Sequence, residues 1–331
     1  MYTLQALLIT ACGVVDSGGP HGPPGTPPPP GGGRPTGAGH VTWTFNGHVF
    51  RIAAAAGTAR EDVTAELAGS RSGNDRWLAP SSNGAFLVLS SERFSAAGEV
   101  LVRATGDLKI AEVVLAGGSP VFAESISAIN DDGTVIVYAS QGGSNEIDLF
   151  RTNRISDGVW SAPQLLTANS GHRVNSSPAF RFDQPSVLFD CGNTPAPESG
   201  NTESCEVGID GGQLRIIVSP ATLPNSRNSF TQFPHAGTRG VLFQGSWPIN
   251  GTSPETIWRL DDRGVPVPAT PTFNNAVSPC GLADGRTVML WLDRPGNTSG
   301  AHELTVVDTD DATFTTLASE DVADIGIGCS D

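Results

Sequence analysis

The residue types that usually carry catalysis are present in this 331-residue chain, but their spacing assembles no familiar catalytic motif. A nucleophilic serine on a strand–turn–helix elbow would show G-x-S-x-G, which the sequence lacks. The six histidines stand at positions 21, 40, 48, 172, 235 and 302, and none has an H-x-x-x-H or Cys/His zinc spacing. No catalytic residue, metal ligand or cofactor site is therefore predicted, and turn or surface positions are the expected roles of the histidines.

Three groups of aspartates could supply carboxylate oxygens to calcium. They are Asp131-Asp132, Asp261-Asp262 and the trio Asp308, Asp310 and Asp311. Each group also stands where the chain needs a turn, and Asp is a favoured turn residue. Because the sequence holds no D-x-D-x-D-G run, turn formation is the first interpretation and calcium binding stays an open alternative.

Residues 123–171 form the clearest structural unit that could position such side chains. Strands are predicted at 125–129, 134–140, 146–152 and 159–167 from their β-branched and aromatic content. Tight turns at Asn130-Asp131-Asp132-Gly133 and Ser156-Asp157-Gly158 separate them. Pro163 places the fourth strand at a sheet edge. Four short antiparallel strands of this kind make one blade-like sheet.

The first turn of this unit recurs along the chain. Its anchors are Asn83, Asp132, Asp183, Ala236 and Asp284, with spacings of 49, 51, 53 and 48 residues. Third strands recur at 99–105, 205–210, 255–261 and 302–308, and fourth strands at 110–116 and 313–319. A fixed period near 50 residues indicates a repeat architecture with five complete units.

The two ends of the sequence supply a sixth unit. Residues 324–331 read as a first strand, while 41–45, 48–54 and 62–67 read as second, third and fourth strands. Joining them leaves no bare sheet edge, which an open array would expose. The sequence therefore predicts an all-β fold, a six-bladed β-propeller closed by the C-terminal first strand and three N-terminal strands.

The repeat S-x-D/N-D-G followed by an apolar run, then E-I-D-L-F and D-G-x-W-S-x-P, resembles the TolB-like propeller repeats of bacterial envelope proteins. The resemblance covers residues 41–331 and is best over 123–185. It implies the propeller fold and a cell-envelope location. It carries over no catalytic residue, because binders and enzymes share this scaffold.

Four of the five cysteines fall in positions that suit pairing. Cys191 ends a second strand and Cys205 begins the third strand of the same blade, so a disulfide could staple that hairpin. Cys280 and Cys329 lie on first strands of adjacent blades, where a disulfide would lock the ring. Two disulfides in an oxidising compartment are therefore predicted, and four buried free thiols are the alternative.

The fifth cysteine lies near the start of the chain. Ile9-Thr10-Ala11-Cys12 resembles a lipobox, which implies a signal peptide over 1–11, cleavage before Cys12 and acylation of its thiol. Nothing else could span a bilayer, because no apolar run approaches 18 residues. An apolar N-terminus with a chance cysteine is the alternative. We expect a lipid-anchored protein, at the outer membrane facing the periplasm or at the cell surface.

Between the cysteine and the first strand, residues 12–40 are rich in Pro and Gly. The stretch 17–39 has almost nothing to bury and favours extended polyproline II, so it reads as a tether. A proline-motif ligand for a partner is the alternative. The net charge of −15 argues against nucleic acid as a partner, since phosphates call for clustered Lys and Arg.

The expected function is a monomeric, membrane-tethered, non-enzymatic scaffold that binds an envelope protein or peptidoglycan at one face of the ring. The alternative is a carbohydrate-active enzyme, a lyase or glycosidase, with acid and base groups converging in the channel. Candidates for that channel mouth are Glu124, His172, Arg173, Arg227 and His235.

A sialidase-like mechanism needs a nucleophilic tyrosine, but Tyr2 lies in the predicted signal peptide and Tyr138 in a predicted buried strand. The tryptophans read as core between blades, with sugar stacking as the alternative for an exposed one.

Overall fold

Short antiparallel strands make up nearly all of the regular structure in the computed structural model of this chain. The structure describes residues 39–67, 72–182, 184–192, 203–219, 230–237, 240–246, 255–270, 275–292, 302–308, 313–320 and 327–331. Residues 37–331 form one compact unit. Among the described residues, no helix is long and apolar enough to cross a membrane.

Five of the six sheets formed by the described residues contain four strands each. The first three have the orders β27 (Ile327–Ser330), β1 (His40–Phe45), β2 (His48–Ala53), β3 (Glu61–Asp62); β4 (Asp75–Pro80), β5 (Phe86–Ser91), β6 (Val100–Thr105), β7 (Ala111–Val113); and β15 (Val174–Phe180), β16 (Ser186–Gly192), β17 (Glu203–Gly208), β18 (Arg215–Val218). The other two are β19 (Phe230–Gly237), β20 (Gly240–Ser246), β21 (Glu255–Leu260), β22 (Pro266–Pro268); and β23 (Ala276–Gly281), β24 (Thr287–Trp291), β25 (His302–Val307), β26 (Phe314–Glu320).

The sixth sheet contains seven strands and comes from the unit that the sequence shows most clearly. Its members are β10 (Ala128–Ile129), β11 (Val135–Ser140), β12 (Asp148–Ser156), β13 (Val159–Trp160), β14 (Gln164–Leu165) and the hairpin β8 (Leu115–Ala116) and β9 (Ser119–Pro120). β8 joins by pairing in parallel with β13, so this sheet draws in a short hairpin from the preceding repeat.

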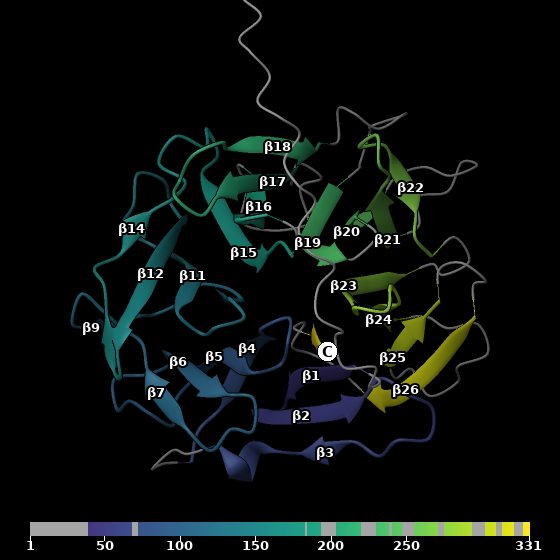
Figure 1. Ribbon diagram of the computed structural model, residues 1–331, viewed down its shortest axis with the longest axis horizontal. Helices are drawn as coiled ribbons and strands as arrows, with labels where there is room; N and C mark the ends of the chain where they lie inside the picture. The colour runs from purple at the N-terminus through teal and green to yellow at the C-terminus, as the bar shows by residue number, and fades with distance from the viewer. Residues whose placement is uncertain are drawn as a thin grey trace, which may run out of the picture. The chain divides into compact units, whose positions relative to one another are not determined.

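The sheets are arranged about a common axis, with their first strands innermost, as a β-propeller (Figure 1). β27 lies against both β4 and β23, β10 against β4 and β15, and β19 against β15 and β23. The last strand of the sequence pairs with the first, since His40 stands opposite Ser330 and Trp43 opposite Ile327. The predicted sharing of one sheet by the two ends of the sequence is therefore present.

Four of the inner strands carry a bulge at the same point. In each of these strands, two residues oppose a single residue of the neighbouring second strand. The paired residues are 77–78 in β4, 177–178 in β15, 233–234 in β19 and 278–279 in β23. The first bulge residue has a positive φ in three of them, Trp77, Ser177 and Ser278. The bulge frees an amide from its own ladder. Two of these amides donate to the preceding sheet, Ser177 N to Ser125 Oγ at 2.9 Å and Ser278 N to Gln244 Oε1 at 3.0 Å.

The core lies mainly between neighbouring sheets. Val88 and Leu101 of one sheet pack with Ile136, Tyr138 and Trp160 of the next, all fully or almost fully buried. Trp43, Trp258 and Trp291 are buried as well, which agrees with the core role expected for the tryptophans. Trp247 lies outside the described residues.

Several predicted fourth strands are shorter or broken. The strand predicted at 62–67 is reduced to β3 (Glu61–Asp62): Asp62 Oδ1 accepts a hydrogen bond from Thr64 N at 3.0 Å, and a 3-10 helix follows at Thr64–Glu66. The stretch 159–167 divides into β13 and β14 around Pro163, which has no amide to donate. Residues 110–116 likewise divide into β7 and β8.

Candidate functional site

A cavity of about 590 Å³ lies where the sheet containing both chain ends meets the sheet β4–β7. Its walls are the start of β1, Arg51 of β2, the turn at Asn83-Gly84, the β6–β7 turn and Ser330. Most of these residues lie on turns or at strand ends. The cavity therefore depends on how the two sheets pack together and not on a single sequence motif.

The turn beside the cavity is fixed from within and from the neighbouring sheets. Asn83 Oδ1 accepts hydrogen bonds from Ala85 N and Ser81 Oγ, both at 2.9 Å. Gly84 has φ 67°, and a Cβ there would lie 3.0 Å from Ser330 Oγ, so glycine permits both the turn and its approach to β27. Asp331 N donates to Ser82 O at 2.9 Å, which ties the last residue to this turn.

Charged groups of both signs surround the opening. Arg51 donates to Gly106 O at 3.3 Å and to Glu61 Oε2 at 3.2 Å, and Lys109 Nζ lies 3.4 Å from Asp107 Oδ2. The Thr105 hydroxyl holds the pKa of Asp107 below its usual range, so this carboxyl is ionised at neutral pH and is a poor general acid. The arrangement suits binding of a ligand with polar and apolar groups better than proton transfer.

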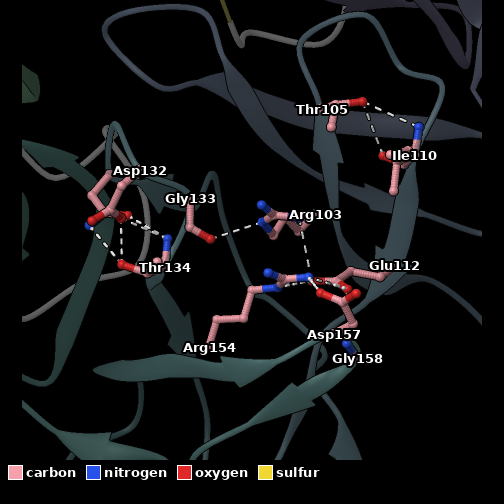
Figure 2. Close-up of polar contacts among 11 residues, drawn as sticks. Arg103, Thr105, Ile110, Glu112, Asp132, Gly133, Thr134, Arg154, Asp157 and Gly158 are labelled. Carbon is pink, nitrogen blue, oxygen red and sulfur yellow. Dashed lines mark hydrogen bonds and ion pairs between the residues drawn. The ribbon is translucent and has the colours of Figure 1, made fainter.

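An exposed apolar side chain stands next to these charges. Ile110 lines the same cavity and is 64% exposed, while Leu87 beneath it is buried. Thr105 Oγ1 accepts a hydrogen bond from Ile110 N at 3.2 Å, which fixes the turn that presents this side chain (Figure 2). The ordered turn therefore keeps the Ile110 side chain exposed at the edge of the cavity.

Both predicted disulfides are present. Cys191 and Cys205 are bonded across the β16–β17 hairpin with Cα atoms 5.9 Å apart, and both are fully buried. Cys280 of β23 and Cys329 of β27 are bonded with Cα atoms 5.6 Å apart and join two neighbouring sheets. Cys12, the predicted lipidation site, lies outside the described residues.

Three of the residues expected at a channel mouth each have a different side-chain partner. Glu124 Oε1 accepts a hydrogen bond from Gln141 Nε2 at 3.0 Å, and Arg173 pairs with Glu146. His172 Nε2 lies 3.4 Å from Glu203 Oε2. Arg227 lies outside the described part of the chain.

The two remaining candidates for chemistry are held in unreactive states. Burial lowers the pKa of His235, whose Nδ1 lies 2.9 Å from Ala236 O, so the ring is neutral at pH 7. Burial raises the pKa of Tyr138 to about 12, which keeps its phenol protonated and unsuited to act as a nucleophile.

The aspartate groups are engaged by protein donors. Asp131 accepts hydrogen bonds from Ser82 Oγ at 2.7 Å and Asn83 N at 3.1 Å, linking the turns of two adjacent sheets. Asp261 Oδ1 accepts from Arg263 N and Val265 N, at 2.9 and 2.8 Å. Asp261 therefore acts in its own turn, as first interpreted, whereas Asp131 links the turns of two sheets; Asp310 and Asp311 lie outside the described residues.

A polar cluster that the sequence did not suggest joins the sheet β4–β7 to the seven-stranded sheet (Figure 2). Glu112 of β7 accepts hydrogen bonds from Arg154 Nε at 2.8 Å and from Gly158 N at 3.0 Å. Arg103 lies 3.5 Å from the same carboxylate and donates to Gly133 O at 2.9 Å. We call these residues the inter-sheet ion cluster. The cluster connects two neighbouring sheets.

Comparison with known proteins bears on the fold. No protein-family model matches the chain, and no curated protein matches it in sequence. Solved structures do match. Hydrazine synthase of Kuenenia stuttgartiensis has a TM-score of 0.57 at 10% identity over 88% of this chain and 46% of that one, so this chain spans less than half of it.

Two further structures are of similar shape. A chain of the nidogen/laminin complex has a TM-score of 0.50 at 10% identity, covering 88% of this chain and 98% of that one. An oligogalacturonate lyase in complex with manganese has a TM-score of 0.50 at 14% identity, covering 83% of this chain and 72% of that one. At such low identity these matches establish the class of fold, the β-propeller, and no activity.

Proposed function

We propose that this chain is the propeller of a bacterial cell-envelope protein and acts as a non-enzymatic scaffold that binds a protein partner. The propeller has six blades in a closed ring. What supports this count is the presence of six sheets, the pairing of β27 with β1, and the bond between Cys280 and Cys329. Five sheets are four-stranded, and the sixth blade is the seven-stranded sheet with its borrowed hairpin.

The observation that carries the binding role is the cavity between the sheet of the chain ends and the sheet β4–β7. Arg51, Lys109, Asp107 and Asp331 provide charges of both signs in its lining, and Ile110 provides an exposed apolar surface. An extended peptide with polar or charged residues beside an apolar one complements these groups. The partner is therefore an envelope protein presenting such a segment, and a cell-wall glycan is the other class of ligand that the scaffold role includes.

The tether and anchor complete this proposal. Acylated Cys12 holds the chain at a membrane, and residues 12–40 let the ring reach a partner in the periplasm or at the cell surface. Mass spectrometry of the mature protein from its native host is expected to find acyl chains on Cys12. A mature chain whose Cys12 carries no lipid would remove the anchor from the proposal.

Site-specific crosslinking in the native envelope tests the binding role. A photoreactive p-benzoylphenylalanine replaces Ile110, and the control places it at Ile155, which is 68% exposed but does not line the cavity. We expect a discrete crosslinked protein from position 110 and none from position 155, with the yield falling when Lys109→Glu is added. Equal crosslinking from both positions, or none from either, would contradict this site.

A carbohydrate-active enzyme is the alternative. It is favoured by the fold shared with a structure of an oligogalacturonate lyase in complex with manganese. The separate partners of Glu124, His172 and Arg173 speak against a shared acid–base site among them. Turnover of acidic or neutral oligosaccharides by the purified protein would establish the enzyme and overturn the scaffold.

A further inference from the structure

The Cys191–Cys205 disulfide has a histidine beside it that the binding role does not use. Donor atoms of His172, Cys191 and Cys205 all lie within 4.8 Å of one another. Both cysteines are fully buried, and the His172 side chain is 11% exposed. Three potential metal ligands are thus already gathered in a largely dry place.

Strand register explains why they meet. On the β16–β17 hairpin, Cys191 stands opposite Glu203, and Cys205 is two residues further along the same strand as Glu203. Side chains two apart on a strand share a face. Asn175 of β15 pairs with Cys191, so His172, three residues earlier in the chain, reaches the same end of the hairpin.

The histidine ring is incompletely satisfied beside the disulfide. Its Nε2 lies 3.4 Å from Glu203 Oε2, whereas its Nδ1 is buried and has no hydrogen-bond partner among the described residues. Buried polar atoms normally have one, and an orphan calls for an explanation such as an ion. The segment itself is well held, since His172 N donates to Ser170 Oγ at 3.1 Å and Ser170 Oγ donates to His172 O at 3.2 Å.

The available donors match the preference of zinc. Two thiolates and one imidazole nitrogen supply three corners of a tetrahedral set, with Zn–S distances of about 2.3 Å and Zn–N distances of about 2.0 Å. Tetrahedral sulfurs at that distance stand about 3.8 Å apart. The pairing of Cα atoms at 5.9 Å allows this separation once the sulfur–sulfur bond is broken, so the hairpin itself can stay in place.

We propose that the Cys191–Cys205 hairpin alternates between a disulfide and a zinc site, in which His172, Cys191 and Cys205 are ligands, a water completes the tetrahedron, and Glu203 orients the His172 ring through Nε2. A dithiol reductant supplies two electrons and two protons, breaks the sulfur–sulfur bond and leaves as its own disulfide. Zn²⁺ then binds both sulfurs and displaces the two thiol protons to solvent. A disulfide oxidant then accepts the two electrons from the thiolates, takes up two protons from solvent and leaves as a dithiol, which reforms the Cys191–Cys205 bond and releases the metal.

Zinc titration of the whole protein tests this. The protein is reduced with dithiothreitol, desalted without oxygen, and titrated with Zn²⁺ against a chromophoric chelator, with bound metal counted by mass spectrometry. We expect one zinc per reduced chain and none per oxidised chain. Cobalt loading should add a thiolate charge-transfer band to the spectrum.

The second disulfide provides a matched internal control. The paired change Cys191→Ser and Cys205→Ser leaves Cys280 and Cys329 in place and should abolish zinc binding. His172→Gln should weaken binding at least about tenfold, since loss of a ligand costs no less than loss of the groups that orient one. Zinc bound equally by the paired variant, unchanged affinity in His172→Gln, or no zinc in the reduced protein would each overturn the proposal.

If the reduced chain unfolds, the zinc titration still tests the proposal. The proposal then requires Zn²⁺ to bind and to restore the β-sheet signal in circular dichroism. A reduced, unfolded chain that zinc neither binds nor refolds counts against it. The outcome is separate from the partner-binding role, because His172 does not line the cavity beside Ile110.

Discussion

Arg154 Nε lies 2.8 Å from Glu112 Oε1, although the two side chains come from different sheets. Glu112 also accepts a hydrogen bond from the backbone of Gly158 at 3.0 Å, so one carboxylate is bound by a strand and a turn of the neighbouring sheet. The Glu112 and Arg154 side chains are 15% and 22% exposed, which shields this pair from much of the solvent screening that weakens surface ion pairs.

Glu112→Gln should lower the free energy of unfolding by about 1–3 kcal/mol, because two charge-assisted hydrogen bonds weaken and Arg154 keeps only Asp157 as a counter-charge. Urea denaturation measures this. Arg263→Gln is the control, because Arg263 is 83% exposed and its pair with Asp261 lies within a single turn; no measurable change is expected there. Equal effects in the two variants would show that the inter-sheet ion cluster has no special role.

Gly133→Ala should be more destabilising than Gly158→Ala. The two glycines have nearly the same φ, 69° and 68°, so the backbone strain of about 1–2 kcal/mol applies to both. A Cβ at Gly133 would lie 2.7 Å from the Phe86 ring and 2.8 Å from Arg103 Nη2, whereas nothing lies within 4 Å at Gly158. Overpacking should add about 1–3 kcal/mol at Gly133 alone. Thermal unfolding of both variants gives the difference, and a zero difference would refute the contact.

The two disulfides should stabilise the fold to different degrees. Cys280–Cys329 closes a loop with a sequence separation of 49, and Cys191–Cys205 one of 14. Loop entropy predicts losses of about 4 and about 3 kcal/mol when each pair is replaced by alanine. Guanidinium denaturation of the two double variants checks the order. Alkylation without reductant should label none of the four cysteines, and labelling of any of them would disprove its pairing.

Stability should fall on acidification through the pKa of free histidine. Burial lowers the pKa of His235 below 6.5, so the folded chain holds the ring neutral while the unfolded chain takes up a proton as pH drops below that value. The contribution of His235 to the free energy of unfolding is therefore fully present above pH 6.5, and it is lost as the pH falls below that value. In the His235→Gln variant, the melting temperature should change less between pH 7.5 and pH 5.5 than it does in the parent protein. A variant as sensitive to pH as the parent would exclude His235 as the source.

Much of the architecture could be predicted from sequence because turns and strands are local features. Asp132-Gly133 and Asp284-Gly285 mark turns by their own chemistry, and their spacing gives the repeat. The disulfides followed, since a cysteine's place within its repeat unit determines which strand it lies on. The broken strand at Pro163 and the 3-10 helix after Asp62 were missed because a fourth strand has only one partner to enforce its conformation.

The candidate sites could not be predicted in the same way. The cavity beside Ile110 forms where residues far apart in the sequence meet across two sheets, and no local signal marks it. His172 meets the Cys191–Cys205 bond only through the register of β15 on β16, which includes the bulge at 177–178. The inter-sheet ion cluster depends on side-chain directions that alternate along strands, so a register error of one residue would have separated Arg154 from Glu112.

The bond between Cys280 and Cys329 also determines how the ring would respond to mechanical load. His40 and Ser330 are paired neighbours, so a pulling force applied at the two ends would open the β1–β27 ladder one hydrogen bond at a time. Because Cys329 is joined to β23, that force passes through a covalent bond to the next sheet after only a few residues. A load applied between the two ends would therefore separate only the few residues outside this disulfide before it is carried by β23.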